Sequence, residues 1–365
     1  MYRSGSIYRT RILVKGKGIR KSRHVIGIGM QKGCSMRKRR VICVLMAAVT
    51  LMVILSGCRS KSETADVSAA DDLFTIRVMT QTGFNELNVA DELGYFKEEG
   101  IKLSYIGTLG KGVTEYQLIE QGQLDAFTGG HPPNVAQARL AGVKVKAVAP
   151  GMVDNEDFPH VRYLVQDSSP LQSLEDITDE KISISGIGAC NDGYIKYYLQ
   201  SKGLPYDKIE WVTLSTGGQQ EQSLVQGQIA ATTSHPPYAG KSLAAGGVRE
   251  IGTSWDIFHS PGAGLSVRGF SEKFIEEHPE IVQGFVNAMY KARIWINTHQ
   301  EEAIEINAKY LKLEPKDLSV FWYDESKNIT PDYIEQWFKI AEAIGLWKEG
   351  DIMPEEVYTN DFIPK

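Results

Sequence analysis

The sequence predicts an α/β protein of two lobes, with mainly parallel sheets flanked by helices and a helical C-terminal third. Short β-rich runs alternate with helical patterns from Thr75 onward, which is typical of α/β folds. A weak internal repeat joins residues 121–133 to residues 226–237, which indicates two similar units. The 308 residues that follow position 57 suffice for two lobes with cores of their own.

The elements follow from local patterns. Candidate strands lie at 75–79, 102–106, 143–148, 181–185, 210–214 and 229–232, and helical patterns lie at 88–99 and 116–121.

The C-terminal third is predicted to be mostly helical and to cover the sheets. Pro279 suits a first helical turn, and Ile281, Phe285 and Met289 then recur at a spacing of four on one face. At residues 330–332, Thr-Pro-Asp offers a capping residue, a helix-opening proline and an early acid.

The internal repeat ends twice in His-Pro-Pro. Residues 121–124 (QGQL) lead to His131, and residues 226–229 (QGQI) lead to His235, with a spacing that differs by one residue. In each copy a polar turn feeds a short strand, and proline, which lacks the N–H, stops further pairing. Open α/β sheets bind ligands at the carboxyl ends of their strands, so each lobe should present these ends to a shared cleft.

The N-terminus reads as a leader, residues 1–57, with a lipoprotein signal peptide at 36–57. A basic cluster at 37–40 precedes an apolar run at 41–54 and the residues LSGC at 55–58. The run falls short of the roughly 20 residues that a membrane-spanning helix needs. We expect Cys58 to carry the lipid, palmitate for instance, and residues 58–72 to form a flexible tether; translation starts at Met1 or Met36.

Charge and cysteine content narrow the class of protein. Residues 1–57 hold 13 of the 40 Lys and Arg and no Asp or Glu, so the remainder carries 27 basic and 45 acidic residues, a formal charge of −18. This charge argues against nucleic acid as a partner. Only Cys190 remains once the leader is removed and Cys58 is acylated, so no intramolecular disulfide is available.

Several segments together resemble the type II periplasmic-binding-protein fold of ABC importers, in the branch for nitrate, sulfonate, taurine and thiamine precursors. The residues that carry the resemblance are 76–79 (IRVM), 93–101 (LGYFKEEGI), 122–125, 136–148, 173–176 (SLED) and 274–279, and it spans about 74–345.

The resemblance implies an extracytoplasmic solute-binding lipoprotein on the outer face of the cell membrane. It would be a monomer that captures a small polar organic molecule or anion and delivers it to the permease and ATPase subunits of an importer. Lobe one would comprise 73–156 and about 266–365, and lobe two 157–265. A pyrimidine thiamine precursor or a metal-dependent ligand is the alternative, and we assign no cofactor.

A glycine-rich loop follows the strand predicted at 181–185. Gly188, Cys190, Asn191 and Asp192 lie in this loop, where free backbone N–H groups at a helix start favour an anion. A tight strand-to-helix turn is the structural alternative. Asp192 would repel a bare anion unless it caps the helix instead.

Three further loops contribute candidate ligand-binding residues. Gln81, Phe84 and Asn85 follow the first strand, and Phe84 either stacks on a planar ligand or lies in the core. Lys111 offers a nearby cation unless it is simply solvated. Thr216 lies in a turn that supplies hydroxyl and amide donors.

Gly130, His131 and His235 are the remaining candidate ligand-binding residues. His131 and His235 would meet across the closed cleft as hydrogen-bond donors, or each would be structural. They can also ligate a transition metal with Cys190 or Asp192, but no close ligand spacing supports this, and we assign no metal site. His160, His259, His278 and His299 have no comparable context.

Enzymatic classes receive little support. The sequence has no Gly-x-Ser-x-Gly elbow, P-loop or zinc-hydrolase helix, and no base for Cys190 is visible in the sequence. We therefore expect a binding protein and not an enzyme. An extracytoplasmic enzyme or a sensory lipoprotein on the same fold remains the alternative of another class.

Overall fold

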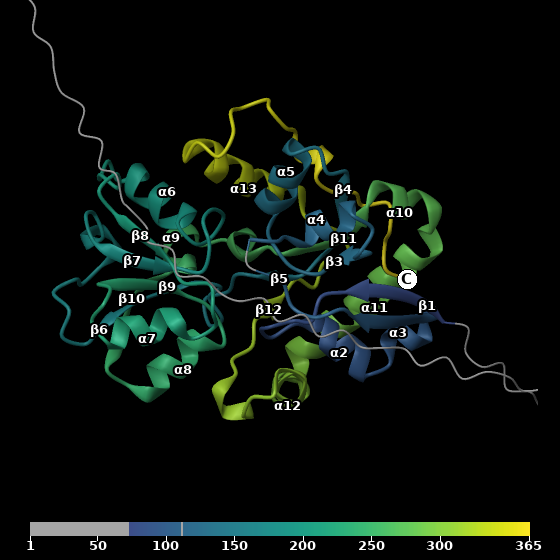
Figure 1. The fold of residues 1–365 in the computed structure, drawn as a ribbon, viewed down its shortest axis with the longest axis horizontal. Helices are drawn as coiled ribbons and strands as arrows, with labels where there is room; N and C mark the ends of the chain where they lie inside the picture. The colour runs from purple at the N-terminus through teal and green to yellow at the C-terminus, as the bar shows by residue number, and fades with distance from the viewer. Residues whose placement is uncertain (1–72, 111) are drawn as a thin grey trace, which may run out of the picture. The chain divides into compact units, whose positions relative to one another are not determined.

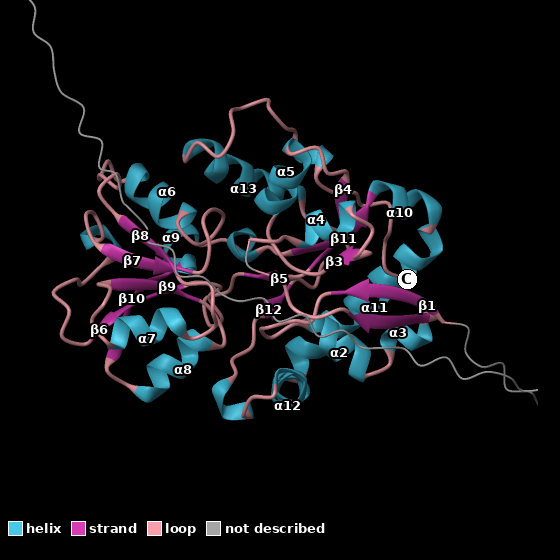
Figure 2. Ribbon diagram, viewed as in Figure 1, coloured by secondary structure: helices cyan, strands magenta, loops and turns pink. Residues whose placement is uncertain are grey.

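The computed structural model describes residues 73–110 and 112–365, and the strands among them form four sheets (Figures 1 and 2). The three smaller sheets contain β1 (Phe74–Val78) with β2 (Ile101–Tyr105); β3 (Ala126–Phe127), β11 (Val267–Ser271) and β4 (Val145–Pro150); and β5 (Met152–Val153) with β12 (Trp322–Tyr323). The pair β1–β2 is parallel, whereas β11 is antiparallel to both β3 and β4.

The largest sheet has five strands in the order β10-β6-β9-β7-β8. Its strands are β6 (Arg162–Gln166), β7 (Lys181–Ile184), β8 (Glu210–Thr213), β9 (Ala231–Ser234) and β10 (Val248–Thr253). Strand β7 pairs in parallel with β8 and β9, but β6 runs antiparallel to β9 and β10. The sheets are thus mixed, because the strands that the sequence patterns did not predict, β5, β6, β10, β11 and β12, all pair in the antiparallel sense.

Helices cover these sheets. They are α2 (Glu86–Glu92), α3 (Tyr95–Glu98), α4 (Glu115–Glu120), α5 (Pro132–Leu140), α6 (Gly193–Ser201), α7 (Gln219–Val225), α8 (Tyr238–Ala245), α9 (Ser254–Phe258), α10 (Glu272–Glu277), α11 (Pro279–Thr298), α12 (Gln300–Leu311) and α13 (Pro331–Ala343). The described residues also contain four short 3₁₀ turns: η1 (Leu174–Asp176), η2 (Pro261–Gly264), η3 (Pro315–Asp317) and η4 (Pro354–Glu356). In Figure 1, α7 and α8 lie on one side of the five-stranded sheet and α6 lies on the other.

The C-terminal third confirms its predicted helical character. Helix α11 begins at Pro279, and its residues Phe285 and Met289 are fully buried against β4, α2 and α3. Helix α13 begins at Pro331 as predicted, but the side chain of its N-cap Thr330 makes no capping hydrogen bond. Proline at the first helical position therefore marks these two starts better than the polar cap does.

The predicted helix at 88–99 is two helices. Helix α2 ends at Glu92, and Gly94 adopts a left-handed conformation with φ of 78° before α3 begins. An L side chain is strained at this φ, so glycine allows the chain to turn between the helices.

Two large apolar clusters form the core. One contains the inward side chains of β6 and β7 together with α6 and α13, and Trp337 is its largest fully buried side chain. The other joins β1, β2, α2 and α11 around Phe285. All described residues belong to one compact unit, and the predicted division into two lobes stays a prediction.

Within the described ranges, no helix has both the length and the apolar character that crossing a bilayer requires. The predicted leader, Cys58 and the predicted tether lie outside the described residues.

Candidate functional site

Loops that follow six strands line a cavity of about 550 Å³. In the part of the chain that precedes the five-stranded sheet, the lining loops follow β1 (Thr82 and Gly83), β2 (Thr108 and Leu109) and β3 (His131). In the five-stranded sheet, they follow β7 (Ser185, Cys190 and Asn191), β8 (Leu214 to Gly218) and β9 (His235 to Tyr238). The carboxyl ends of these strands thus meet at one cavity, as expected for ligand binding in open α/β sheets.

His131 is held rigidly in this cavity wall. It precedes Pro132 of α5, and its backbone N–H donates to Asn134 Oδ1 at 2.8 Å. Its ring stacks on Trp337 with 4.6 Å between ring centroids, and its Nδ1–H donates to the Leu265 carbonyl at 2.7 Å. The other nitrogen, Nε2, therefore keeps its lone pair.

Cys190 and His235 come together from different loops. The Sγ atom of Cys190 lies 3.4 Å from Nε2 of His235. Cys190 is buried and His235 is half-buried, and both line the cavity.

His160 lines the same cavity, although the sequence patterns did not single it out. It lies two residues before β6, and the pairing of Arg162 with Ser234 brings it next to His235. Its ring centroid lies 4.8 Å from that of His131 and 4.9 Å from that of His235. The side chain is 2 % exposed, and neither ring nitrogen has a hydrogen-bond partner. No sequence motif marks it, because antiparallel strand pairing alone creates the contact.

Burial keeps His131, His160 and His235 neutral at physiological pH, because it lowers the pKa of each. Burial lowers the pKa of His131 and of His235 to about 4. Burial also lowers the pKa of His160 well below its usual value, and the neighbouring His131 and His235 add to this. Burial raises the pKa of the Cys190 thiol to about 12. Because burial disfavours charge, none of these groups serves as a cation or as a free thiolate in the empty site.

The remaining described lining mixes polar and apolar side chains. Glu221 is the only Asp, Glu, Lys or Arg among the lining residues that the structure describes, and its Oε1 accepts a hydrogen bond from Ser234. Thr216 lies in the turn after β8 and lines this cavity, as well as a second one. The predicted cation, Lys111, lies outside the described residues.

Asp192 lies behind the glycine-rich loop and not in this lining. Its carboxylate accepts from the backbone N–H of Gly188 at 2.5 Å and forms an ion pair with Lys196. Asn191 lines the cavity, and its Oδ1 accepts from Ser185 at 2.7 Å. The carboxylate thus stabilises the loop from behind. Its charge is paired with Lys196 and would repel an anion in the cavity less than a free carboxylate would.

The second cavity, of about 770 Å³, shares Thr82, Thr108, Leu109, Ser215 and Thr216 with the first and is therefore continuous with it. Gln81 and Gly130 line it, whereas Asn85 caps α2 through its side chain. Gln81 donates to Thr128 Oγ1 at 2.7 Å and accepts from Asn85 at 3.0 Å. Phe84 is buried in the core near Tyr323 and lines neither cavity.

Gly130 has a local reason to be glycine. Its φ is 104°, and an added Cβ would lie 3.0 Å from the hydroxyl oxygen of Tyr116. Any larger residue here would strain the backbone and crowd the cavity wall.

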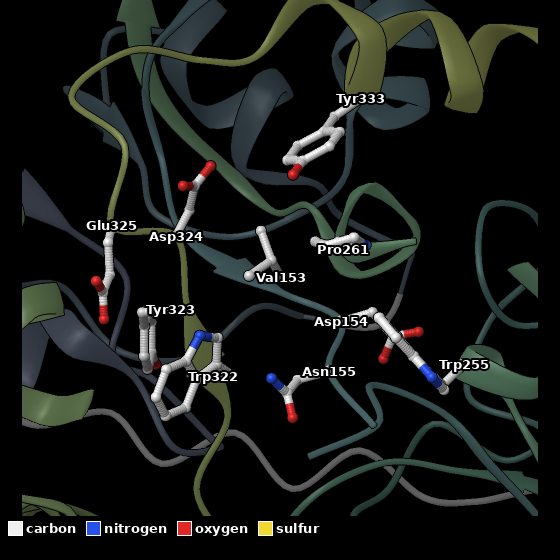
Figure 3. Close-up of a pocket in the computed structure, with 10 residues that line it drawn as sticks. All are labelled: Val153, Asp154, Asn155, Trp255, Pro261, Trp322, Tyr323, Asp324, Glu325 and Tyr333. Carbon is white, nitrogen blue, oxygen red and sulfur yellow. The ribbon is translucent and has the colours of Figure 1, made fainter. Parts of the chain in front are cut away.

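A third cavity, of about 290 Å³, is acidic (Figure 3). Asp324 and Glu325 lie on the segment after β12, with Asp154 and Trp255 across from them and Tyr333 of α13 above. Asp154 accepts from the backbone N–H of His160 at 2.6 Å, and burial raises the pKa of its carboxyl to about 6. Three carboxyl groups make this cavity unsuitable for an anion.

Comparisons with known proteins agree with this architecture. A family model described as "NMT1/THI5 like" matches residues 81–303. A Bacillus subtilis (strain 168) protein named "Putative aliphatic sulfonates-binding protein" is 24% identical over 324 residues, which are 87% of this chain and 88% of that protein.

Solved structures confirm the predicted fold. The periplasmic aliphatic sulphonate binding protein SsuA of Escherichia coli superposes with a TM-score of 0.62 at 17% identity, over 80% of this chain and 92% of that one. The desulfurization enzyme DSZB superposes with a TM-score of 0.57 at 17% identity, over 79% and 97% of the two chains. The same fold therefore serves both binding and catalysis.

Proposed function

This chain belongs to the NMT1/THI5-like family, and from that premise we propose that it is the extracytoplasmic solute-binding lipoprotein of an ABC importer. It takes up a small polar organic molecule or anion in the cavity of about 550 Å³ and its extension. The observation that carries the proposal is the meeting of six strand ends at one polar cavity, in a chain that matches a sulfonate-binding relative over most of both lengths.

An aliphatic sulfonate is the first candidate solute. Thr108, Thr216 and Asn191 bring hydroxyl and amide groups to the cavity, which can donate to sulfonate oxygens. The described lining of this cavity has no Lys or Arg, so the contribution of the described residues to holding the anion would be hydrogen bonds. A taurine-like or nitrate-like ion uses the same donors.

A planar pyrimidine is the second candidate. The ring of Tyr238 lines the cavity and offers an aromatic surface, a role for which the sequence had suggested Phe84. A solute that stacks on Tyr238 would gain apolar contact that a small inorganic anion cannot use.

An enzyme is disfavoured by the chemistry of Cys190. The contact with His235 at 3.4 Å resembles a nucleophile beside a base. However, burial raises the pKa of the thiol to about 12 and lowers that of His235 to about 4, so proton transfer from thiol to imidazole is unfavourable. A reactive cysteine needs the opposite shifts.

The proposed function also includes delivery of the bound solute to the permease. A lipid on Cys58 would hold the monomer at the outer face of the membrane, and binding would favour a closed form that the permease recognises. The acidic charge of the exported chain, −18, argues against nucleic acid as a partner.

Thermal unfolding of the purified full chain tests the proposal against sulfonates, taurine, nitrate, bicarbonate and aminopyrimidines. A solute that binds only the folded state adds about 2.7 kcal/mol at 100 times its dissociation constant. We expect Thr216→Val to weaken binding of the active compound about tenfold, the loss of roughly one hydrogen bond to a charged group.

The matched control is Thr330→Val, because the Thr330 side chain makes no capping hydrogen bond and lines none of the three cavities. It should bind like the unaltered protein. If no member of the panel shifts the unfolding temperature, or if Thr216→Val binds normally, the assignment of the solute to this cavity is wrong.

A further inference from the structure

Four metal-ligating side chains converge at the inner wall of the cavity of about 550 Å³. His131, His160 and Cys190 each offer one ligand atom, and these atoms all lie within 4.8 Å of one another. His235 lies 3.4 Å from Cys190 and joins the same group. The four residues come from four parts of the chain that no local motif connects: the end of β3, the start of β6, the end of β7 and the end of β9.

The orientation of His131 is that of a metal ligand. Its Nδ1–H donates to the Leu265 carbonyl at 2.7 Å, which leaves the Nε2 lone pair for another partner. Histidines that bind metals usually donate their second ring N–H to a carbonyl or carboxylate in this way, which sets both tautomer and ring orientation.

His160 lacks any alternative partner. Both of its ring nitrogens are buried without a hydrogen bond, and its nearest ring neighbours include His131 and His235. A buried polar group without a partner is costly, so native proteins rarely leave one unsatisfied. A bound ion would give one of these two nitrogens a partner.

The spacing suits a tetrahedral ion. With metal–sulfur and metal–nitrogen bonds of about 2.3 and 2.05 Å, tetrahedral angles place S and N about 3.6 Å apart and two N atoms about 3.3 Å apart. The observed 3.4 Å between Cys190 Sγ and His235 Nε2 is already near this value. The ligand atoms of His131, His160 and Cys190, which all lie within 4.8 Å of one another, would have to move inward.

We propose that His131, His160, His235 and Cys190 form a binding site for a transition-metal ion of the zinc class. Three imidazoles and one thiolate are ligands for borderline and soft cations such as Zn²⁺ and Co²⁺, whereas Mg²⁺ and Ca²⁺ need oxygen ligands that this group lacks. On coordination the Cys190 thiol releases its proton to solvent, and no electron is transferred.

A bound ion would also add positive charge to the cavity. The described lining contains no Lys or Arg, and its histidines are neutral in the empty protein. A bound divalent ion would place positive charge at the inner end of the cavity, where a polar or anionic solute enters. The metal site itself does not depend on the identity of that solute.

Cobalt titration of the chelator-treated full chain tests the proposal. Tetrahedral Co²⁺ bound to a thiolate gives strong visible bands and a thiolate-to-metal charge-transfer band. We expect one equivalent of Co²⁺ to produce both and one equivalent of Zn²⁺ to abolish them. Cys190→Ser should lose the charge-transfer band, and His235→Ala should weaken Zn²⁺ binding at least tenfold.

His299→Ala is the matched control, because His299 is exposed and stacks on Trp295 away from the cluster. It should titrate like the unaltered chain. Failure of the unaltered chain to bind either ion, or an unchanged charge-transfer band in Cys190→Ser, would overturn the proposal. If Cys190→Ser does not fold, the test depends on His235→Ala, whose altered side chain is only half-buried. An unchanged Zn²⁺ affinity in this variant would also overturn the proposal.

Repeating the solute panel with chelator and with Zn²⁺ separates the two proposals. Metal binding without any solute supports the metal site and contradicts the proposed importer function for this panel. A solute that binds to the chelated chain while Zn²⁺ does not bind supports the importer function and overturns the metal site.

Discussion

Nε2 of His235 lies 3.4 Å from Sγ of Cys190, although 45 residues separate them in the chain. Cys190 lies in the glycine-rich loop after β7, and His235 follows β9, the parallel neighbour of β7. Two adjacent strands that end at the same edge of a sheet therefore bring a thiol and an imidazole into contact. This contact links two features that the sequence presents separately, the glycine-rich loop and the His-Pro-Pro repeat.

The two repeat histidines should differ in their effect on stability. His131→Ala removes a stacking contact with Trp337 and a hydrogen bond to Leu265, so we expect it to lower the free energy of unfolding by about 2–4 kcal/mol. His235→Ala removes a half-buried ring and should cost less than about 1 kcal/mol. Urea unfolding of the solute-free protein measures both. Equal losses would show that the two histidines have equivalent structural roles.

Glu115 should make stability fall as the pH rises. Burial raises the pKa of its carboxyl to about 6 from an ordinary 4.5, although Thr128 donates to it and Arg268 attracts it. The folded state therefore holds the proton more tightly, so the stabilisation is complete below pH 4.5 and is lost as the pH rises through 6. The shift corresponds to about 2 kcal/mol.

Glu115→Gln tests this dependence, because the amide stays neutral at every pH. Urea midpoints between pH 4 and 8 should fall less steeply in this variant than in the unaltered protein. Glu120→Gln, an exposed change at the end of the same helix, is the control and should follow the unaltered profile. Parallel profiles for Glu115→Gln and the unaltered protein would contradict the assignment.

The ion pair between Arg268 and Glu86 should be a major determinant of stability. The two side chains are 4% and 0% exposed, with 2.9 Å between Arg268 and the carboxylate of Glu86. Arg268→Met leaves a buried carboxylate without its partner, and we expect a loss of about 3–5 kcal/mol in the free energy of unfolding. Lys273→Met, which breaks an exposed pair with Glu277 at 3.8 Å, should change nothing measurable. Similar denaturation midpoints for the two variants would refute this interpretation.

Local patterns predicted the elements that depend on neighbouring residues. The proline-led starts of α11 and α13 and the buried positions of Phe285 and Met289 follow from helical geometry and apolar spacing. Strands β6, β10 and β11 were not predicted, and their pairing partners lie far away in the chain, where local patterns carry no information about them. The position of Phe84 could not be predicted from local sequence either, because an apolar ring suits a core and a cavity wall equally well. Only the packing of the folded chain places it in the core.

The sequence by itself determined the alternation of strands and helices, the loops that end in His131 and His235, and the family to which the chain belongs. Only the tertiary structure decided that His160 lies between those histidines and that Asp192 braces a backbone loop. The physical reason is that helix starts and turns depend on residues a few positions apart, whereas a binding site depends on strand pairing and burial. Strand pairing sets which distant side chains meet, and burial removes their charge, so neither can be read from one segment alone.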